Sequence, residues 1–278
     1  MSVDVPLESI PKTVDDEIAA NLMNYLVPLS TVRQPRSSEP SMTFIGSGTL
    51  VEIHGGFHIL TAAHVWHEAK DEDELGLALT TYPSAFVVPR KAISAKEMWN
   101  RDSPEWGPDL ALLDLPRPFV STIAAYKSFL NLALHRSTLS AHPPATEKGL
   151  WAVTGMVGQF SEVQRLPDAE AIEWTAHARA FLSNVCETHW RNGYDYVDPR
   201  VKLDLPGVPS TFGGVSGGGL WEVGLSMTKS GTIYFDGRRH FRGVAFWESE
   251  PSDGRRVIRC HGPRSIFERA WAEWRLPG

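Results

Sequence analysis

The chain has 278 residues, of which 42% are hydrophobic and 22% are charged, and these proportions are typical of a globular protein with a sizeable core. Acidic residues outnumber basic ones by 33 to 27, and the resulting net charge of -6 lacks the basic excess that attracts phosphate backbones or anionic lipid. The composition therefore argues against nucleic acid and the membrane surface as main partners.

Three further features of the sequence concern its location. Residues 1–30 lack the basic and then apolar segments of a secretion signal and carry an acidic cluster at 15–17. No later stretch approaches the roughly 20 continuous apolar residues of a membrane-spanning helix. Cys186 and Cys260 are the only cysteines, too few for a disulfide framework, although a single disulfide between them remains open. We therefore expect a cytoplasmic protein.

The first elements predicted along the chain are a helix and a loop. Ile18, Leu22 and Leu26 recur at every fourth position between residues 14 and 26, which predicts a short amphipathic helix packed against the body of the protein. The polar residues 34–40 then predict a loop. Beyond residue 42 the apolar pattern changes from a period of four to a period of two, so a β-domain is expected to begin there.

Short apolar or alternating runs, divided by proline, glycine and charged residues, predict strands over most of the remaining chain. A first set occupies residues 42–53, 56–60, 75–79, 85–88 and 110–115, and a second set occupies residues 149–156, 178–185, 220–225, 232–235 and 241–247. Between the two sets, residues 116–144 carry prolines at both ends and predict an inter-domain connection. Helical composition returns at 265–274, where Phe267, Trp271 and Trp274 share one face.

Three short motifs offer the side chains of a nucleophilic hydrolase in the order His64, Asp109, Ser216. A serine hydroxyl is a weak nucleophile at neutral pH, so it needs a histidine to take its proton and a carboxylate to orient and stabilise that histidine. His64 and Asp109 each have a simpler alternative, as a buried core histidine and as a carboxylate that caps a strand end. Asp114 competes with Asp109 for the orienting role.

The glycine-rich segment 213–219 surrounds Ser216 with five glycines. Glycine adopts backbone conformations that residues with a Cβ avoid, so the amides of Gly214 and Ser216 can turn inward and form an oxyanion hole. A flexible turn or a phosphate cradle is the alternative. The segment lacks, however, the lysine and the following helix of a P-loop.

Taken together, these motifs resemble those of trypsin-like serine proteases, which have the chymotrypsin fold. The matching strings are Gly-Ser-Gly-Thr-Leu at 46–50, Leu-Thr-Ala-Ala-His at 60–64, Asp-Leu-Ala-Leu-Leu at 109–113 and Gly-Val-Ser-Gly-Gly at 214–218. The resemblance implies an all-β fold of two antiparallel six-stranded β-barrels, with the triad in the cleft between them.

This resemblance also implies a division of the chain into five parts. They are an N-terminal helical extension at 1–30, a first barrel with His64 and Asp109 at 31–116, a connection at 117–147, a second barrel with Ser216 at 148–262, and a C-terminal helix at 263–278.

The sequence departs from the secreted members of that family in two ways. Val215 stands where they carry an aspartate that pairs with a freshly cut N-terminus, and the usual disulfides are missing. The chain therefore looks more like an intracellular bacterial or viral-type member than a secreted zymogen. We expect it to be active without N-terminal cleavage, or to be controlled by a partner that orders the glycine-rich segment.

Alignment to the motif around Ser216 also suggests a pocket for the side chain at the cleaved position. Ser210 would form its floor, with Phe246, Trp247 and Glu248 along one wall. Because Ser210 is small and uncharged, a small or apolar substrate side chain is favoured over Arg or Lys, unless Glu248 supplies a negative charge.

The function expected from these residues is that of a serine endopeptidase, which cleaves a protein or peptide substrate through an acyl-enzyme. It needs no metal or organic cofactor, and the His54 and His58 pair and the His64 and His67 pair lack the clustered Cys or Glu partners of a zinc site. Two alternatives are an esterase with the same triad and a latent or inactive peptide-binding scaffold, to which some of the ten tryptophans would contribute surface. Residues 1–30 are a candidate docking element for a regulatory protein.

Overall fold

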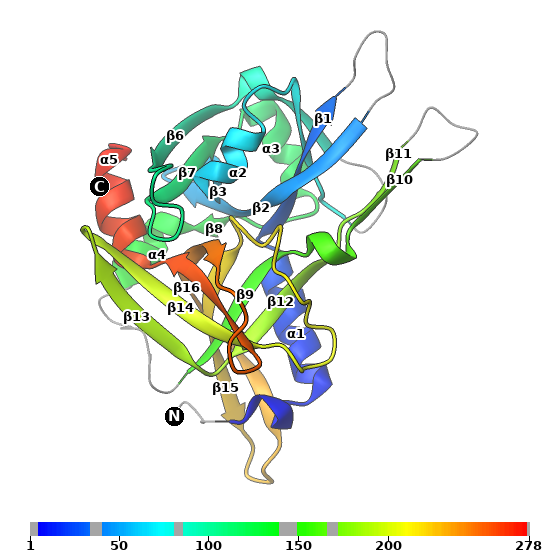
Figure 1. Cartoon of the computed structure of the whole chain (residues 1–278), viewed down its shortest axis with the longest axis vertical. Coiled ribbons are helices and arrows are strands. Elements are labelled where there is room, and N and C mark those ends of the chain that lie inside the picture. Colours follow the sequence, from blue (N-terminus) through cyan, green and yellow to red (C-terminus); the bar gives the residue numbers. More distant parts are fainter. Residues whose placement is uncertain (1–4, 34–40, 81–85, 139–148, 166–171, 277–278) are drawn as a thin grey trace.

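The computed structural model describes residues 5–33, 41–80, 86–138, 149–165 and 172–276. They form two large sheets, built almost entirely from antiparallel pairs, with a few short helices at their edges. In Figure 1 the first sheet lies in the upper half of the molecule and the second in the lower half. The predicted all-β class with two antiparallel sheets is confirmed.

The first sheet has eight strands in the order β5-β4-β1-β2-β3-β7-β6, with β8 added beside β2. All these pairs are antiparallel except β8 with β2. The strands are β1 (Leu26–Arg33), β2 (Ser41–Ile53), β3 (Gly56–Thr61), β4 (Glu74–Leu77), β5 (Phe86–Pro89), β6 (Ser94–Trp99), β7 (Asp109–Asp114) and β8 (Leu130–Asn131).

The second sheet has seven strands in the order β12-β9-β15-β16-β17-β14-β13, and β10 pairs with β11 in a separate two-stranded ribbon. The strands are β9 (Leu150–Met156), β10 (Glu162–Arg165), β11 (Ile172–Thr175), β12 (Ala178–Ser183), β13 (Cys186–Arg191), β14 (Tyr194–Lys202), β15 (Gly219–Met227), β16 (Ile233–Glu248) and β17 (Arg255–His261). The strand numbers are therefore eight and seven, where six in each barrel were predicted.

The helices are short and lie between or beside the strands. They are η1 (Leu7–Ser9), α1 (Lys12–Met23), α2 (Ala63–Glu68), η2 (Arg90–Ala92), α3 (Arg117–Ala124), α4 (Leu132–Thr138), η4 (Gly158–Phe160), the π-helical η5 (Ser265–Ala270) and α5 (Trp271–Glu273). Within the described ranges, no helix combines the length and the apolar character that crossing a membrane requires.

The predicted N-terminal helix exists, but it ends earlier than predicted. α1 stops at Met23, and Leu26 begins strand β1 instead of completing the helix. The first seven residues of β1 are all buried, because the strand lies between β2 and β4 and is covered on both faces. A strand buried on both faces shows no alternation of apolar and polar residues, so the sequence carried no period-two signal for it.

The apolar face of α1 is covered by the protein itself. Val14, Ile18 and Leu22 are buried in one cluster with Leu150 and Trp221 of the second sheet. Figure 1 shows α1 beside that sheet, although the helix precedes the first sheet in the sequence. This face is therefore a part of the core and is not free to dock the regulatory partner suggested from the sequence.

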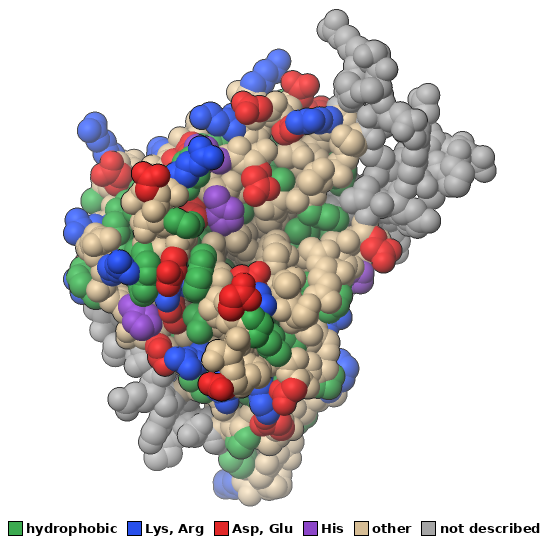
Figure 2. All heavy atoms as spheres, in the orientation of Figure 1, with side chains coloured by type: hydrophobic (Ala, Val, Ile, Leu, Met, Phe, Trp, Pro, Cys, Tyr) green, Lys and Arg blue, Asp and Glu red, His purple; other side chains and the backbone are tan. Residues whose placement is uncertain are grey.

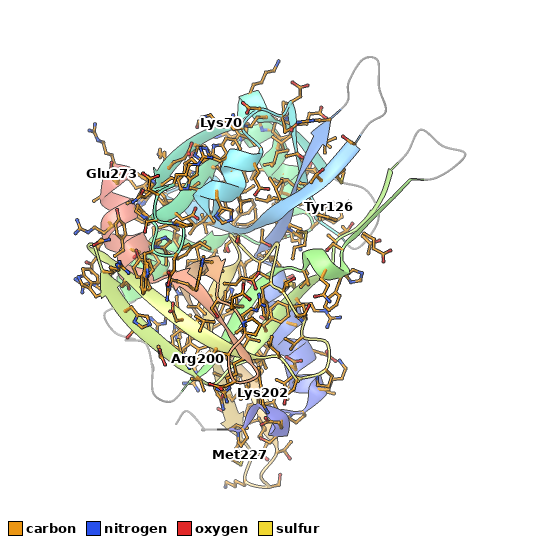
Figure 3. The ribbon with its side chains drawn as sticks, in the orientation of Figure 1. Lys70, Tyr126, Arg200, Lys202, Met227 and Glu273 are labelled. Carbon is orange, nitrogen blue, oxygen red and sulfur yellow. The ribbon has the colours of Figure 1, made fainter. Side chains whose placement is uncertain are left out.

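The largest of three buried apolar clusters is shared between the two sheets. A single buried cluster joins Leu60 and Leu112 of the first sheet to Phe241 and Val244 of the second. Figure 3 shows side chains filling the region where the sheets face each other. The position of one sheet relative to the other is therefore set by close packing, which tolerates little displacement.

The C-terminal helix packs into the cluster that the two sheets share. Phe267, Trp271 and Trp274 are buried, as their shared face predicted. The Trp271 ring meets the ring of His54 edge-on, with 6.1 Å between the two centroids, and His54 belongs to the turn between β2 and β3. The last helix of the chain thus packs on a hairpin of the first sheet.

The two cysteines are free thiols. Cys186 lies on β13 and Cys260 on β17, and β14 runs between these strands. Two strand spacings separate their backbones by roughly 10 Å, beyond the roughly 7 Å that a disulfide spans. The disulfide left open by the sequence is thereby excluded, and burial also raises the pKa of both thiols.

Candidate active site

His64 and Asp109 form a pair with two contacts. The ring Nδ1 of His64 lies 2.6 Å from one carboxylate oxygen of Asp109, and the backbone N–H of His64 donates to the other oxygen at 2.9 Å. His64 stands in the first turn of α2, directly after β3, and Asp109 is the first residue of β7, which pairs with β3. Because Asp109 takes Nδ1, the nitrogen left for other partners is Nε2.

The electrostatics of this pair favour a protonated histidine. Burial acts to lower the pKa of His64, but the hydrogen bond to Asp109 and its negative charge outweigh burial, with a smaller contribution from Glu68. The net result is a pKa above the ordinary value for histidine. A carboxylate that stabilises an imidazolium in this way has the electrostatic part of the role that a triad requires.

Asp114, the competing carboxylate, serves another histidine. One of its oxygens lies 2.8 Å from Nδ1 of His58, and the other accepts a hydrogen bond from Ser94 at 2.6 Å. The hydrogen bond with His58 also lowers the pKa of Asp114. The geometry therefore assigns the contact with His64 to Asp109.

The remaining candidate metal ligands have carboxylate partners of their own or lie apart. His67 Nε2 is 2.5 Å from Glu97, and its ring lies against the ring of Trp99, with 3.6 Å between centroids and 33° between planes. Over the described ranges, no three His, Cys, Asp or Glu side chains gather in a way that would hold a metal ion.

Ser47 fastens the glycine-rich segment to the first sheet. Its Oγ donates to the carbonyl of Gly214 at 2.7 Å and accepts from the amide of Met156 at 2.8 Å. Its own backbone N–H donates to the carbonyl of Ser216 at 2.8 Å. Ser47 is fully buried on β2, so a single residue of the first sheet holds the segment that carries Ser216.

This contact brings Ser216 next to the turn that carries His64. A Cβ placed on Gly46 would lie 2.7 Å from a methyl group of Val65 and 3.0 Å from the carbonyl oxygen of Ser216. Only the backbone of Gly46 thus separates the residue after His64 from the backbone of Ser216. The absence of a side chain at this position permits the close approach.

The Ser216 hydroxyl contacts a backbone carbonyl rather than His64. Its Oγ lies 3.5 Å from the carbonyl oxygen of Phe246, a long hydrogen bond. In the part of the chain that the structure describes, no hydrogen bond joins Ser216 to His64. The structure therefore brings together His64 and Asp109, with Ser216 beside them but not bonded to them.

The amides of the glycine-rich segment fall into two groups. Those of Val215, Gly217 and Gly218 donate to the carbonyls of Phe212, Ala245 and Val215 at 2.7 to 2.9 Å. That of Gly219 donates to Oγ1 of Thr154 at 3.2 Å, and those of Gly213, Gly214 and Ser216 donate to no acceptor among the described residues. Gly214 adopts φ +94, in the left-handed region. Two of these unused donors, on Gly214 and Ser216, lie two residues apart, one of them on the serine, which is what an oxyanion hole needs.

The predicted pocket residues have partners that the sequence did not indicate. Both the N–H and the Oγ of Ser210 donate to the side-chain oxygen of Gln159 at 3.0 Å. Glu248 accepts from the amide of Phe212 at 3.0 Å and forms an ion pair with Arg256. Its negative charge is therefore already balanced within the protein.

Phe246 and Trp247 lie behind this region. Phe246 is buried, with its ring stacked on His261, and the guanidinium of Arg259 lies 4.9 Å from the ring of Trp247. None of the motifs around His64, Asp109 and Ser216 contains Gln159, Arg256 or His261. Only their tertiary contacts connect them with the site.

The Asp109→Asn substitution is expected to lower the pKa of His64, because it removes the charge that stabilises the imidazolium. In the unsubstituted protein the raised pKa stabilises the folded state fully below the ordinary pKa of histidine, and this contribution is lost as the pH rises through the raised value. The substitution should remove that pH-dependent contribution. Titration of the His64 ring by NMR, with the free energy of unfolding measured against pH, tests this.

Asp114→Asn is the matched control, since Asp114 contacts His58 rather than His64. It should leave the titration of His64 unchanged. An equal effect of the two substitutions, or no effect of Asp109→Asn, would contradict the assignment.

Gly217→Ala is expected to disrupt the junction between the sheets. Gly217 has φ +88, and an added Cβ would lie only 1.9 Å from the carbonyl oxygen of Ser47 and 2.1 Å from Oγ1 of Thr61. The backbone conformation alone costs an alanine about 1 to 3 kcal/mol, and the overlap adds to this loss. Denaturant unfolding measures the change.

Gly213→Ala in the same segment is the control, because no atom lies within 4 Å of its added Cβ. It should change the free energy of unfolding by less than about 0.5 kcal/mol. Equal stability of the two variants would refute the tight junction.

Comparisons with known proteins do not place the chain in a family. No protein-family model matches the sequence, and no curated protein matches it. One solved structure to which it is similar comes from work on the coupled folding and binding of the intrinsically disordered VPg protein of Sesbania mosaic virus. The match covers 88% of this chain and 95% of that chain, with 14% identity and a TM-score of 0.40. A likeness at this level supports no conclusion about function.

Proposed function

We propose that the chain is a serine endopeptidase of the trypsin-like class, with Ser216 as nucleophile, His64 as general base and Asp109 as the orienting carboxylate. One observation carries the proposal. The paired His64 and Asp109 and the two unused amides of Gly214 and Ser216 meet at one junction between the sheets. The order of the three residues and their motifs, which resemble those of that class, support the same function.

In the proposed mechanism, Ser216 Oγ attacks the carbonyl carbon of a peptide bond while His64 Nε2 takes its proton. The hydroxyl contacts the carbonyl of Phe246 in the structure, so it must first form its hydrogen bond with His64. Such alignment often tightens only when substrate binds. Asp109 stabilises the imidazolium, in keeping with the raised pKa of His64.

The negative charge that develops on the carbonyl oxygen is stabilised by the amides of Gly214 and Ser216. One such donor contributes about 3 to 4 kcal/mol to the transition state. His64 then protonates the leaving amine, and water, activated by the same histidine, hydrolyses the acyl-enzyme. This chemistry uses only side chains and backbone of the chain.

Activity without N-terminal cleavage is a part of the proposal. Val215 is buried in an apolar cluster with Phe212 and Val157, so packing holds the position before the nucleophile. Ser47 holds the residues on either side of it. The glycine-rich segment is thus ordered by contacts within the folded chain, and no newly formed N-terminus is needed.

The substrate is proposed to be a protein or peptide with a small or apolar side chain at the cleaved position. Glu248 is paired with Arg256, so it offers no free charge to Arg or Lys. The two free cysteines fit a reducing compartment, and the proposed location is the cytoplasm.

One observation favours a second candidate, a latent or inactive peptide-binding protein on the same fold. Ser216 Oγ contacts the carbonyl of Phe246 rather than His64. If substrate or a partner does not turn the hydroxyl, the three residues never act together.

Labelling with a fluorophosphonate separates the two candidates. The unsubstituted protein is expected to form one adduct, located at Ser216 by mass spectrometry, because the probe needs an activated serine. Ser216→Ala and His64→Ala should lose labelling and lower kcat on a peptide substrate about ten-thousand-fold or more. Ser230→Ala, in the exposed turn between β15 and β16, is the control and should still be labelled. Failure of well-folded unsubstituted protein to react would favour the latent protein.

A library of peptide substrates tests the pocket. We expect cleavage after small or apolar residues and poor cleavage after Arg and Lys, because the charge of Glu248 is balanced by its ion pair with Arg256. Arg256→Gln frees the Glu248 carboxylate and should raise cleavage after Arg and Lys relative to the unsubstituted protein. A clear preference of the unsubstituted protein for Arg or Lys would show that the pocket assignment is wrong.

A further inference from the structure

His261 contacts Asp109, a residue of the candidate triad. It is the last residue of β17 and is fully buried. Its Nε2 accepts a hydrogen bond from the backbone N–H of Asp109 at 3.0 Å. His261 belongs to the second sheet and Asp109 to the first, so this hydrogen bond crosses the junction between the sheets.

The same ring touches the other half of the site. It stacks on Phe246, with 4.4 Å between centroids and 22° between planes. The carbonyl of Phe246 is the group that accepts from Ser216 Oγ. One side chain thus lies between the residue that carries the carboxylate and the residue that contacts the nucleophile.

The backbone before Asp109 packs closely against the His261 ring. Gly107 has φ +56, and an added Cβ there would lie 3.0 Å from Nε2 of His261 and 2.9 Å from the amide of Asp109. The chain therefore passes directly over the edge of the ring as it enters β7. A displaced ring would leave the start of β7 without its support.

A role in packing alone does not account for the histidine. Since Nε2 accepts a hydrogen bond, the ring proton lies on Nδ1, and Nδ1 is buried with no partner among the described residues. An unsatisfied buried donor costs about 1 to 3 kcal/mol, which an apolar ring would avoid. Such an exception in a folded protein calls for a specific explanation.

The ring is also held neutral. Burial lowers the pKa of His261 to about 3, with Asp109 as the charged group that opposes this shift. Nε2 therefore keeps its lone pair, and with it the hydrogen bond from Asp109, at every pH at which the protein would act.

We infer that His261 is a positioning residue, which fixes Asp109 relative to Ser216 by holding the Asp109 amide on one side and the ring of Phe246 on the other. It acts through these two residues and touches no substrate. The inference rests on the proposed protease function for its kinetic consequence, but its structural consequence, the placement of Asp109 against His64, is measurable without any substrate.

Two substitutions at this position separate a hydrogen-bonding role from packing. In His261→Gln the side-chain oxygen replaces Nε2 and can accept from the Asp109 amide. In His261→Phe a ring of similar shape fills the space but accepts nothing. The first readout is the titration of His64 by NMR, and the second is peptide hydrolysis, resolved into kcat and KM.

With His261→Phe we expect His64 to titrate at a lower pH than in the unsubstituted protein, because Asp109 is less firmly held against it. We also expect kcat to fall about 10-fold to 100-fold, the effect of a misplacement of about 1 Å, with KM changed less than about twofold. His261→Gln should restore most of both properties. If His261→Phe does not fold, His261→Asn, whose amide is too short to reach the Asp109 N–H, takes its place.

A folded His261→Phe protein with the His64 titration and kcat of the unsubstituted protein would overturn the inference. So would a His261→Gln protein that is as impaired as His261→Phe. If the unsubstituted protein hydrolyses no peptide but His64 shifts in His261→Phe and recovers in His261→Gln, the protease proposal fails and the positioning role stands.

Discussion

The buried hydroxyl of Ser47 is the contact on which the candidate site depends. From a strand of the first sheet, it satisfies the amide of Met156 on β9 of the second sheet and the carbonyl of Gly214 in the loop before β15. Without it, two backbone groups would lose their partner, and the segment around Ser216 would keep only the hydrogen bond from the Ser47 backbone N–H as its polar contact with that residue. The chemistry of the site is thus a product of how the two sheets dock, since neither sheet holds all three residues.

A second contact between the two sheets involves the loop that precedes Asp109. The guanidinium of Arg259, on β17, is bound to the carboxylate of Asp198 by hydrogen bonds of 2.8 and 3.1 Å, and it also reaches Glu105 at 3.0 Å. It stacks over the ring of Trp106 at 3.6 Å, and the hydroxyl of Tyr196 donates to the carbonyl of Trp106. On the face of the molecule shown in Figure 2, acidic and basic side chains are interspersed. Arg259, by comparison, is buried and forms ion pairs with both Glu105 and Asp198. The loop that leads into Asp109 is therefore anchored on the second sheet.

The sequence predicted those features of the site that depend on a few neighbouring residues. Gly214 and Gly217 need backbone conformations that glycine supplies, and the residues next to His64 and Asp109 lie in strands and turns that short patterns indicate, so these positions were predictable. Strand β1 was missed because it is buried and shows no alternation. Strands β14 and β17 were missed because buried charged residues such as Asp198 and Arg259 interrupt their apolar pattern. Strands β6, β8, β10, β11 and β13 were not predicted either. His261, Gln159 and Arg256 were missed because each acts on a residue far away in the sequence. The position of the Ser216 hydroxyl depends on packing that no motif encodes.

The placement of α1 has a consequence for how the chain acquires its structure. Ile18 and Leu22 belong to one buried cluster with Trp221 and Phe241, which are synthesised some 200 residues later. On a ribosome that adds about 5 to 20 residues per second, the apolar face of this helix stays incompletely covered for about ten seconds or longer before β15 and β16 emerge. Contacts so distant in sequence also slow the folding of the completed chain. During that interval the helix offers a binding surface that the finished protein no longer has, and a chaperone that recognises exposed apolar helices would meet it only in the nascent chain.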